Sequence, residues 1–432
     1  MIPAVRSGLG LVTLICLVIA NMIGAGVFTT SGFALGDLGS PVLVLTAWLI
    51  GGIIAVCGAI SYGALSRLLP YSGGEYLFLS RSIHPLAGFV AGWISLLAGF
   101  TGAIAYTAIT FAVYILPDSS SSTLTENIVA TLAILAAVGI HGVRVRHGVA
   151  IQNASVALKL LFMLFFLGSI AFGPAIADWD GVRAFRVADN HDFSLTAFAT
   201  TLMWISFSYS GFNAAIYVAG EVGNARQIVP RAMFHATIIT TIIYLVLNTI
   251  FVFAPDPAAV SFREDVATIA AAALGGDALA GVIRTIIIIA LFTSISAMVM
   301  IGPRVYAQMA EDGLLPGALR FTRDTPHIAI AMQAVLAIVV VWITGLRELL
   351  SYLGFTLGLS AAATVASLFV LVRREPGLAA QLPAYPWAPL IFISFTLLFA
   401  GLAAFRNPWE MLAAILTIAT GILLYFILRR SS

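Results

Sequence analysis

The chain has 432 residues, of which 61% are hydrophobic and only 9% are charged, and its mean hydropathy is +1.05. Soluble domains carry about 25% charged residues, so this composition excludes an ordinary soluble protein and predicts an integral membrane protein. The 21 basic and 19 acidic residues leave a net charge of +2, which gives no reason to expect a nucleic-acid partner.

Hydrophobic runs along the chain predict an all-α fold that crosses a membrane twelve times. Each crossing needs about 20 apolar residues, because the bilayer core is about 30 Å thick. The runs cover residues 9–35, 41–68, 86–116, 126–142, 149–173, 194–220, 231–254, 279–308, 328–345, 348–372, 387–405 and 408–428. The apolar stretch 258–276 is interrupted by Arg263, Glu264 and Asp265, so we expect short surface helices there and no thirteenth span.

The arginines in the loops predict the orientation of the chain. With the N-terminus inside, fourteen arginines fall on the cytoplasmic side and six on the outer side, while Lys159 lies within a span. Basic residues accumulate in cytoplasmic loops, so we expect a multi-pass protein of the plasma (inner) membrane with both termini cytoplasmic. All nineteen carboxylates fall at span ends or in loops, and none is expected near the midplane.

Predicted spans 1 and 6 are interrupted by glycine and by small or polar residues. Span 1 carries the run 21–28, NMIGAGVF, and span 6 carries the run 208–213, SYSGFN. Glycine-rich faces also let membrane helices pack closely, and this alternative stays open for either run alone. The two interruptions lie five spans apart, however, and paired breaks in corresponding spans of two inverted halves are typical of transporter binding sites.

A broken helix exposes backbone groups that suit an amino acid. Unpaired amides at the start of one half helix favour a carboxylate, and unpaired carbonyls at the end of the other half favour an ammonium group. One break can therefore hold both charged ends of an amino acid. Because no acidic residue is expected within the spans, a substrate with a cationic side chain is disfavoured.

Lys159 is the only lysine of the chain, and it lies in the apolar run 149–172. An amine at membrane depth usually faces a protein interior, a cavity or a transport path. The structural alternative is a lysine that snorkels to the interface, and a third reading is a Schiff-base lysine of a chromophore protein. Twelve spans and two breaks disfavour the chromophore.

Five stretches together carry a family resemblance, and each alone is weak. They are residues 22–28, residues 70–76 leading to 85–93, the Lys159 segment, residues 221–231 and residues 304–316. Across nearly the whole chain they resemble the amino acid-polyamine-organocation superfamily. The resemblance implies a LeuT-type fold with inverted repeats of five helices in residues 1–173 and 174–372, followed by two further helices in residues 373–432.

The resemblance also implies a substrate site, residue by residue. The matching positions are Met22, Ile23 and Ser210 for the substrate amine, Ala25 and Gly26 for its carboxylate, and Phe207, Ser208 and Asn213 around the pocket, where Phe207 is the aromatic cap of some members. Ala25 departs from the serine common in the family, so one hydroxyl contact is expected to be missing. Asn213 matches the asparagine that members of the L-amino-acid transporter branch carry at this position. Similar arginine antiporters carry a glutamate at the same position, so the asparagine favours neutral substrates.

Lys159 resembles the lysine that sodium-independent relatives place where sodium-driven ones bind their second sodium ion. The resemblance implies that its ammonium group donates to the region of Gly24 and to the hydroxyls of Thr293 or Ser294. A fixed charge at that position would replace the structural role of the cation.

The sequence therefore predicts a sodium-independent transporter of small neutral amino acids that works by alternating access. Two mechanisms stay open, namely exchange and proton-coupled uptake with Lys159 as the proton carrier. The alternative from another class is a membrane sensor that binds amino acids without moving them, although we expect a sensor to carry a soluble output domain. No catalytic triad, metal-ligand cluster or ATP-binding motif is found, so the sequence predicts no enzyme, no metal site and no cofactor.

Overall fold

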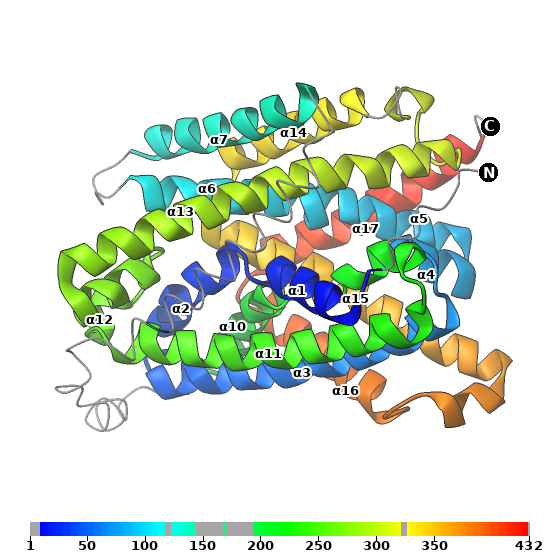
Figure 1. Ribbon diagram of the computed structural model, residues 1–432, viewed down its shortest axis with the longest axis horizontal. Coiled ribbons are helices and arrows are strands. Elements are labelled where there is room, and N and C mark those ends of the chain that lie inside the picture. The colour runs from blue at the N-terminus through cyan, green and yellow to red at the C-terminus, as the bar shows by residue number, and fades with distance from the viewer. Residues whose placement is uncertain (1–8, 117–121, 144–167, 169–192, 321–325, 431–432) are drawn as a thin grey trace.

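The computed structural model describes residues 9–116, 122–143, 168, 193–320 and 326–430, and within these ranges it is a bundle of long helices (Figure 1). In chain order the helices are α1 (Leu11–Met22), α2 (Ala25–Leu38), α3 (Pro41–Leu68), α4 (Gly74–Ser82), α5 (Pro85–Ile94), the π-helix η1 (Ser95–Gly102), α6 (Ala103–Ile115), α7 (Thr123–Val143), α10 (Leu195–Ser208), the 3₁₀-helix η4 (Ala214–Glu221), α11 (Ala225–Phe253), α12 (Pro257–Val260), α13 (Val266–Glu311), η5 (Gly317–Leu319), α14 (His327–Ile343), α15 (Leu346–Arg374), η6 (Pro376–Gln381), α16 (Trp387–Ala404) and α17 (Pro408–Arg430).

The lengths and composition of these helices make the chain a multi-pass membrane protein. In the described residues, eight helices are long and apolar enough to cross a bilayer, and the bent pair α1 and α2 passes the same test as one unit. The apolar helices α10 and α14 are shorter, with 14 and 17 residues. Predicted span 149–173 lies outside the described residues except for residue 168, so the count of twelve stays a prediction.

The turn between α2 and α3 shows how the sequence sets these boundaries. α2 ends at Gly39, whose φ of 63° is left-handed and therefore favours glycine. Ser40 then caps α3 by accepting a hydrogen bond from the amide of Leu43, and Pro41 occupies the first helical position. Two consecutive long helices are joined in this way by only two residues.

Residues 257–276 form short helical pieces, as expected, but they are not confined to the surface. The long helix α13 is broken near its start at Gly275 and Gly276, whose backbone angles are not helical. Val260, Val266 and Ala267 are fully buried, because this segment folds over α2. The expectation of surface helices is therefore wrong for the apolar face of this segment.

Small residues of α2 allow this close approach. The amide of Phe262 donates to the carbonyl of Gly32 at 2.8 Å. A Cβ atom on Gly32 would overlap the carbonyl oxygen of Arg263, and one on Gly36 would lie 2.5 Å from the ring of Phe262. The segment before α13 thus covers the C-terminal turns of α2.

The bundle has two ends, and each is named here after a short helix that lies at it. The long helices α3, α11 and α13 run between them (Figure 1). We call one the α12 end, where α2 finishes and α12 lies. The opposite one is the α4 end, where α4, the start of α5 and the end of α17 lie.

A buried carboxylate closes the α12 end. The side chain of Asp37 is only 4% exposed, and Arg347 Nη2 lies 2.7 Å from its Oδ1 and from its Oδ2. Arg406 Nη2 lies 3.5 Å from Oδ2. The guanidinium of Arg347 also lies 5.1 Å from the ring centre of Trp204 and 5.8 Å from that of Phe262, within the range of cation–π attraction. One arginine of α15 therefore joins α2, α10 and the segment before α13.

Arg347→Met is expected to destabilise the protein more than the matched variant Arg406→Met. Without Arg347, the only remaining ion-pair partner of the buried Asp37 among the described residues is Arg406, at the longer distance of 3.5 Å. The loss of such a pair with a partly exposed arginine lowers the free energy of unfolding by about 1–3 kcal/mol. Removing Arg406 leaves the short pair intact and is expected to cost less than about 1 kcal/mol. Thermal unfolding of the purified variants in detergent measures the difference. Equal shifts in the apparent melting temperature would contradict this ranking.

Candidate functional site

The first helix changes direction within the run 21–28. α1 ends at Met22 and α2 begins at Ala25, with Ile23 and Gly24 between them in extended conformations. The two helices meet at an angle of 43°. In the described residues no side chain caps the start of α2, so the amides of its first turn, which have no helical partner, are left for a ligand or for water. Their partial positive charge favours an anion.

A second interruption follows α10. The helix ends at Ser208, and the chain continues through a turn at residues 209–213 before η4 begins. Gly211 has a φ of 98°, which L side chains rarely adopt. The amide of Ser210 donates to the carbonyl of Phe207 at 2.9 Å, which tightens the end of the helix.

The two interruptions touch each other through their backbones. A Cβ atom on Gly211 would lie 2.9 Å from the carbonyl oxygen of Asn21 and 3.2 Å from the nitrogen of Met22. A Cβ atom on Gly26 would lie 3.0 Å from the Cα of Ser208. All three distances are shorter than ordinary contacts of a Cβ atom, so the two breaks can meet in this way only with glycine at both positions.

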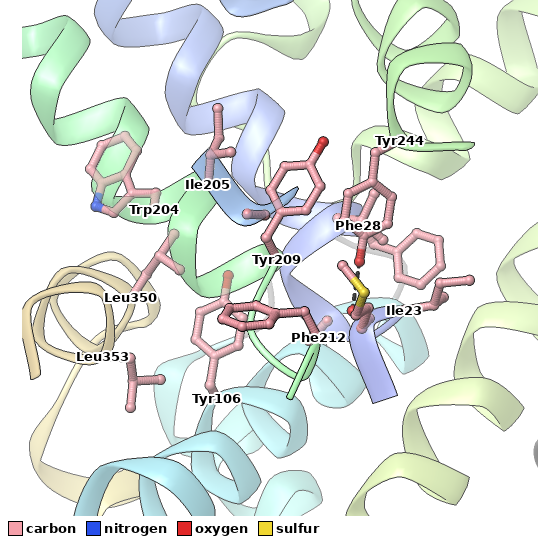
Figure 2. Packing of buried hydrophobic residues seen from close by; sticks show 14 of the residues in the cluster. Ile23, Phe28, Tyr106, Trp204, Ile205, Tyr209, Phe212, Tyr244, Leu350 and Leu353 are labelled. Carbon is pink, nitrogen blue, oxygen red and sulfur yellow. Dashed lines mark hydrogen bonds between the residues drawn. The ribbon is translucent and has the colours of Figure 1, made fainter. Parts of the chain in front are cut away.

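Tyr244 of α11 joins the ends of both half helices. Its hydroxyl lies 2.6 Å from the carbonyl oxygen of Met22 and 3.0 Å from that of Ser208, so that its hydrogen is shared between the last residues of α1 and α10. Figure 2 shows the side chain reaching from α11 toward the break beside Ile23. The ring packs against Trp48 and Tyr209, with centroid distances of 5.3 and 5.1 Å.

Tyr244 was not among the site residues predicted from the sequence. The available signal is weak: a tyrosine inside the apolar run 231–254 must find a partner for its hydroxyl when it is buried, and Tyr244 is fully buried. Nothing in the sequence tells which partner it finds, because Met22 lies 222 residues away.

A cavity of about 950 Å³ contains both interruptions. Of the residues proposed from the sequence, its wall includes Met22, Gly24, Ala25, Gly26, Phe207, Ser208, Ser210, Asn213, Thr293 and Ser294. Ile23 is not part of the wall and is 3% exposed. Lys159 lies outside the described residues.

The polar side chains near the breaks mostly bond to the protein itself. Ser208 Oγ lies 3.0 Å from Thr30 Oγ1, which links α10 to α2. The hydroxyls of Thr293 and Ser294 both donate to the carbonyl of Ala290. Phe207 packs edge-on against Tyr106 at 5.2 Å, and it is partly exposed on the cavity wall. The backbone therefore supplies more of the polar surface at the breaks than the side chains do.

A π-helix forms part of the wall opposite the breaks. η1 connects α5 to α6, and Ser95, Gly99 and Phe100 from this segment line the cavity. π-Helical segments are rare in proteins, and those that occur often lie at functional sites. The sequence analysis treated residues 86–116 as one regular helix and did not find this feature.

The cavity reaches the α4 end of the bundle. The exposed residues Ser72, Glu221 and Asp312 are part of its wall, together with Leu9 and Thr13 near the start of α1. Asp37, Arg347 and Phe262 at the α12 end are not. The structure is thus open toward the α4 end and closed at the α12 end.

Glu75 brings a carboxylate into this cavity. Gly73 and Gly74 have φ values of 147° and 61°, which turn the chain into α4. On Oε1, Glu75 accepts hydrogen bonds from the Tyr62 hydroxyl at 2.6 Å and from Asn213 Nδ2 at 3.3 Å, and on Oε2 it accepts one from Ser360 Oγ at 2.7 Å.

The sequence placed Glu75 in the loop after predicted span 2 and gave it no role, whereas in the structure it lies at the start of α4, on the cavity wall. α4 has only nine residues and is not a membrane-spanning helix. Burial raises the pKa of the Glu75 carboxyl, while the hydrogen bonds from Tyr62, Ser360 and Asn213 oppose the rise.

The chemistry of this site is that of binding. Amides at the start of α2 and carbonyls at the ends of α1 and α10 converge on one cavity, which suits a zwitterion of small size. Groups of three or more histidine, cysteine, aspartate or glutamate residues that could hold a metal ion are not found in the part of the chain that the structure describes.

Comparison with known proteins agrees with this geometry. The family model described as amino acid permease matches residues 9–426. The human large neutral amino acids transporter small subunit 2 is 26% identical over 438 residues, which cover 98% of this chain and 81% of that protein. The serine/threonine exchanger SteT of Bacillus subtilis (strain 168) is 25% identical over 429 residues, which cover 98% of this chain and 96% of the exchanger.

A third relative has the same coverage of this chain. The human Asc-type amino acid transporter 1 is 26% identical over 444 residues, covering 98% of this chain and 82% of the relative. The match to the family model extends across both interruptions and the whole described bundle. The chain therefore belongs to the amino acid permease family, within the amino acid-polyamine-organocation superfamily.

Proposed function

We propose that the protein moves small neutral amino acids across the membrane by alternating access and without sodium. The observation that carries the proposal is the meeting of the two interruptions in one cavity. The free amides at the start of α2 would bind the substrate carboxylate through Ala25 and Gly26. The carbonyls of Met22 and Ser210 would accept from its amine.

The proposed substrate class rests on the polar side chains of the cavity wall near Asn213 and on the names of the related proteins. Asn213 places an amide on the cavity wall where a carboxylate would favour a cationic substrate. The nearby Glu75 already accepts three hydrogen bonds, so its charge is engaged within the protein. The names of two relatives refer to large neutral amino acids and to serine and threonine, and these names support a neutral side chain.

The open and closed ends support alternating access. The positive-inside assignment makes the α4 end cytoplasmic, so the structure would represent an inward-open state. The outward-open state would then require Arg347 to release Asp37 and Phe262 to leave the outer turns of α2. The cost of separating this buried ion pair would favour the inward-open state in the absence of substrate.

Sodium independence rests on Lys159 as the substitute for a cation beside Gly24, Thr293 and Ser294, and this residue lies outside the described residues. Exchange and proton-coupled uptake are both compatible with the cavity. The two inverted repeats, residues 1–173 and 174–372, belong to the same proposal.

Substrate competition in proteoliposomes tests the proposed function. We expect uptake of labelled alanine to be inhibited by serine, threonine and leucine, and to be unchanged when sodium is replaced by choline. Arginine and lysine are expected to compete at least about ten-fold less well, because an unpaired cationic side chain loses its hydration in the pocket. Transport that prefers arginine, or that requires sodium, would contradict the proposal.

The alternative of a sensor is tested in the same preparation. A sensor binds labelled alanine but gives no uptake that is stimulated by amino acid inside the vesicles. A transporter gives that stimulated uptake. Binding with no stimulated uptake in a protein of intact fold would therefore favour the sensor.

A further inference from the structure

We propose that Glu75 is the proton-binding group that couples transport to the proton gradient. This inference rests on the proposed function, because it concerns the energy source of the same transport cycle. It differs from the sequence-based hypothesis, in which Lys159 carries the proton.

The position of Glu75 is the first argument. Its carboxylate lies on the wall of the cavity that holds both interruptions. Three donors from three separate parts of the fold converge on it, namely Tyr62 of α3, Asn213 of the interruption after α10, and Ser360 of α15. A change in its charge therefore acts on three elements at once.

In the described part of the chain, Glu75 has hydrogen-bond donors but no ion-pair partner. In the described part of the chain, the titratable side chains that share the cavity wall with Glu75 are Tyr76 on α4, Tyr209 after α10, Tyr217 and Glu221 on η4, Arg304 on α13 and Asp312 just after it, and Tyr62 of α3 donates to Glu75 directly. Helix α5 carries no titratable side chain, and α15 contributes the Ser360 hydroxyl. Between residues that the structure describes, no ion pair includes Glu75. Among the described residues its partners are hydrogen-bond donors and not cations, and burial favours the protonated form.

Protonation changes these hydrogen bonds in a defined way. A proton on Oε2 makes the carboxyl a donor to Ser360 Oγ, which reverses that bond. Oε1 becomes a neutral carbonyl oxygen, and its bonds from Tyr62 and Asn213 lose the strength that the negative charge supplied. The bond from Asn213 is the longest of the three, at 3.3 Å, and is the one most weakened.

Weakening of the Asn213 bond links the proton to the substrate site. Asn213 lies three residues after Ser210, whose carbonyl is proposed to accept from the substrate amine, and η4 begins immediately after Asn213. With Glu75 ionised, Asn213 is held against α4. With Glu75 protonated, the segment after α10 is freer to move when the cavity closes at the α4 end. Protons reach Glu75 from the α4 end, where the cavity wall is exposed at Ser72.

Glu75→Gln tests the inference, because glutamine resembles the protonated carboxyl in shape and charge. In proteoliposomes with labelled alanine, the wild type is expected to accumulate substrate when an inward proton gradient is applied. In Glu75→Gln we expect the gradient-driven accumulation to fall about ten-fold or more, a factor within the range that typical coupling energies produce. The variant is expected to retain exchange of internal for external alanine. The matched control is Glu221→Gln, which removes an exposed carboxylate of the same cavity and is expected to keep both activities.

A second variant covers the case in which Glu75→Gln fails to fold. Tyr62→Phe removes a donor that favours the charged form of Glu75, so the pKa of Glu75 rises. Because coupling needs the protonated form, it is present below the pKa and is lost as the pH rises through it. The pH at which gradient-driven uptake is half-maximal is therefore expected to rise, because the lost hydrogen bond stabilised the charged form. A purely structural role would lower the rate without moving this midpoint.

The outcomes separate this inference from the proposed function. No alanine exchange by the folded wild type would contradict the proposed function itself. Exchange by the wild type without any response to the proton gradient would overturn the role of Glu75 alone. Undiminished accumulation in Glu75→Gln would also overturn it, as would an unchanged pH midpoint in Tyr62→Phe. If Lys159→Ala abolishes the response to pH while Glu75→Gln keeps it, Lys159 is the carrier and the inference is wrong.

Discussion

Gly211→Ala is expected to abolish amino acid binding. The residue has a φ of 98°, and a Cβ atom there would lie 2.9 Å from the carbonyl oxygen of Asn21 and 3.0 Å from its carbonyl carbon. The left-handed conformation alone costs an L residue roughly 1–2 kcal/mol. The backbone contact must also open, which displaces the end of α1 from the turn after α10. A displacement of about 1 Å at such a site can reduce activity about 100-fold.

Equilibrium binding of labelled alanine to the purified variant measures this effect. The control is Gly223→Ala in the loop after η4, where a Cβ atom would meet nothing within 4 Å. Gly26→Val is expected to act in the same direction as Gly211→Ala, because its side chain would enter the contact with Ser208 at the start of α2. Unchanged affinity in Gly211→Ala and Gly26→Val, in protein that is folded, would contradict the assignment of the site.

Tyr244→Phe is expected to reduce transport about ten-fold or more while the protein still folds. The variant leaves the carbonyls of Met22 and Ser208 without their shared donor, and an unsatisfied buried acceptor costs about 1–3 kcal/mol. The aromatic contacts with Trp48 and Tyr209 remain. We therefore expect the loss to fall on the positions of the two half helices rather than on the packing of the core.

Tyr209→Phe is the matched control for Tyr244→Phe. Tyr209 directly follows α10, but the hydroxyl that this variant removes donates to the carbonyl of Trp48 at 3.2 Å and not to Met22 or Ser208. Initial rates of alanine exchange compare the two variants. An equal loss in both would show that the bridge between the half helices has no special role.

Much of the fold and part of the site follow from local patterns in the sequence. The interruptions at residues 21–28 and 208–213 are visible because glycine and polar residues stand out in apolar runs, and the structure brings both to one cavity. Individual residues within a run are harder to place. Ile23 was proposed for its backbone carbonyl, and that role stays a prediction; its side chain is buried and is not part of the cavity wall.

The features that the sequence did not predict depend on contacts between distant parts of the chain. Tyr244 meets Met22 across 222 residues, and Arg347 meets Asp37 across 310 residues. Glu75 looked like a loop residue because α4 is short and polar, and only tertiary packing turns its carboxylate toward the cavity. The hydrophobic pattern that reveals spans carries no information about such contacts.

A structure of the protein with a bound neutral amino acid tests the central claim most directly. We expect the substrate carboxylate to lie within hydrogen-bonding distance, about 3 Å, of the amides of Ala25 and Gly26. We expect the substrate amine at the carbonyls of Met22 and Ser210. An amino acid bound elsewhere in the cavity, with those amides facing only water, would contradict the claim.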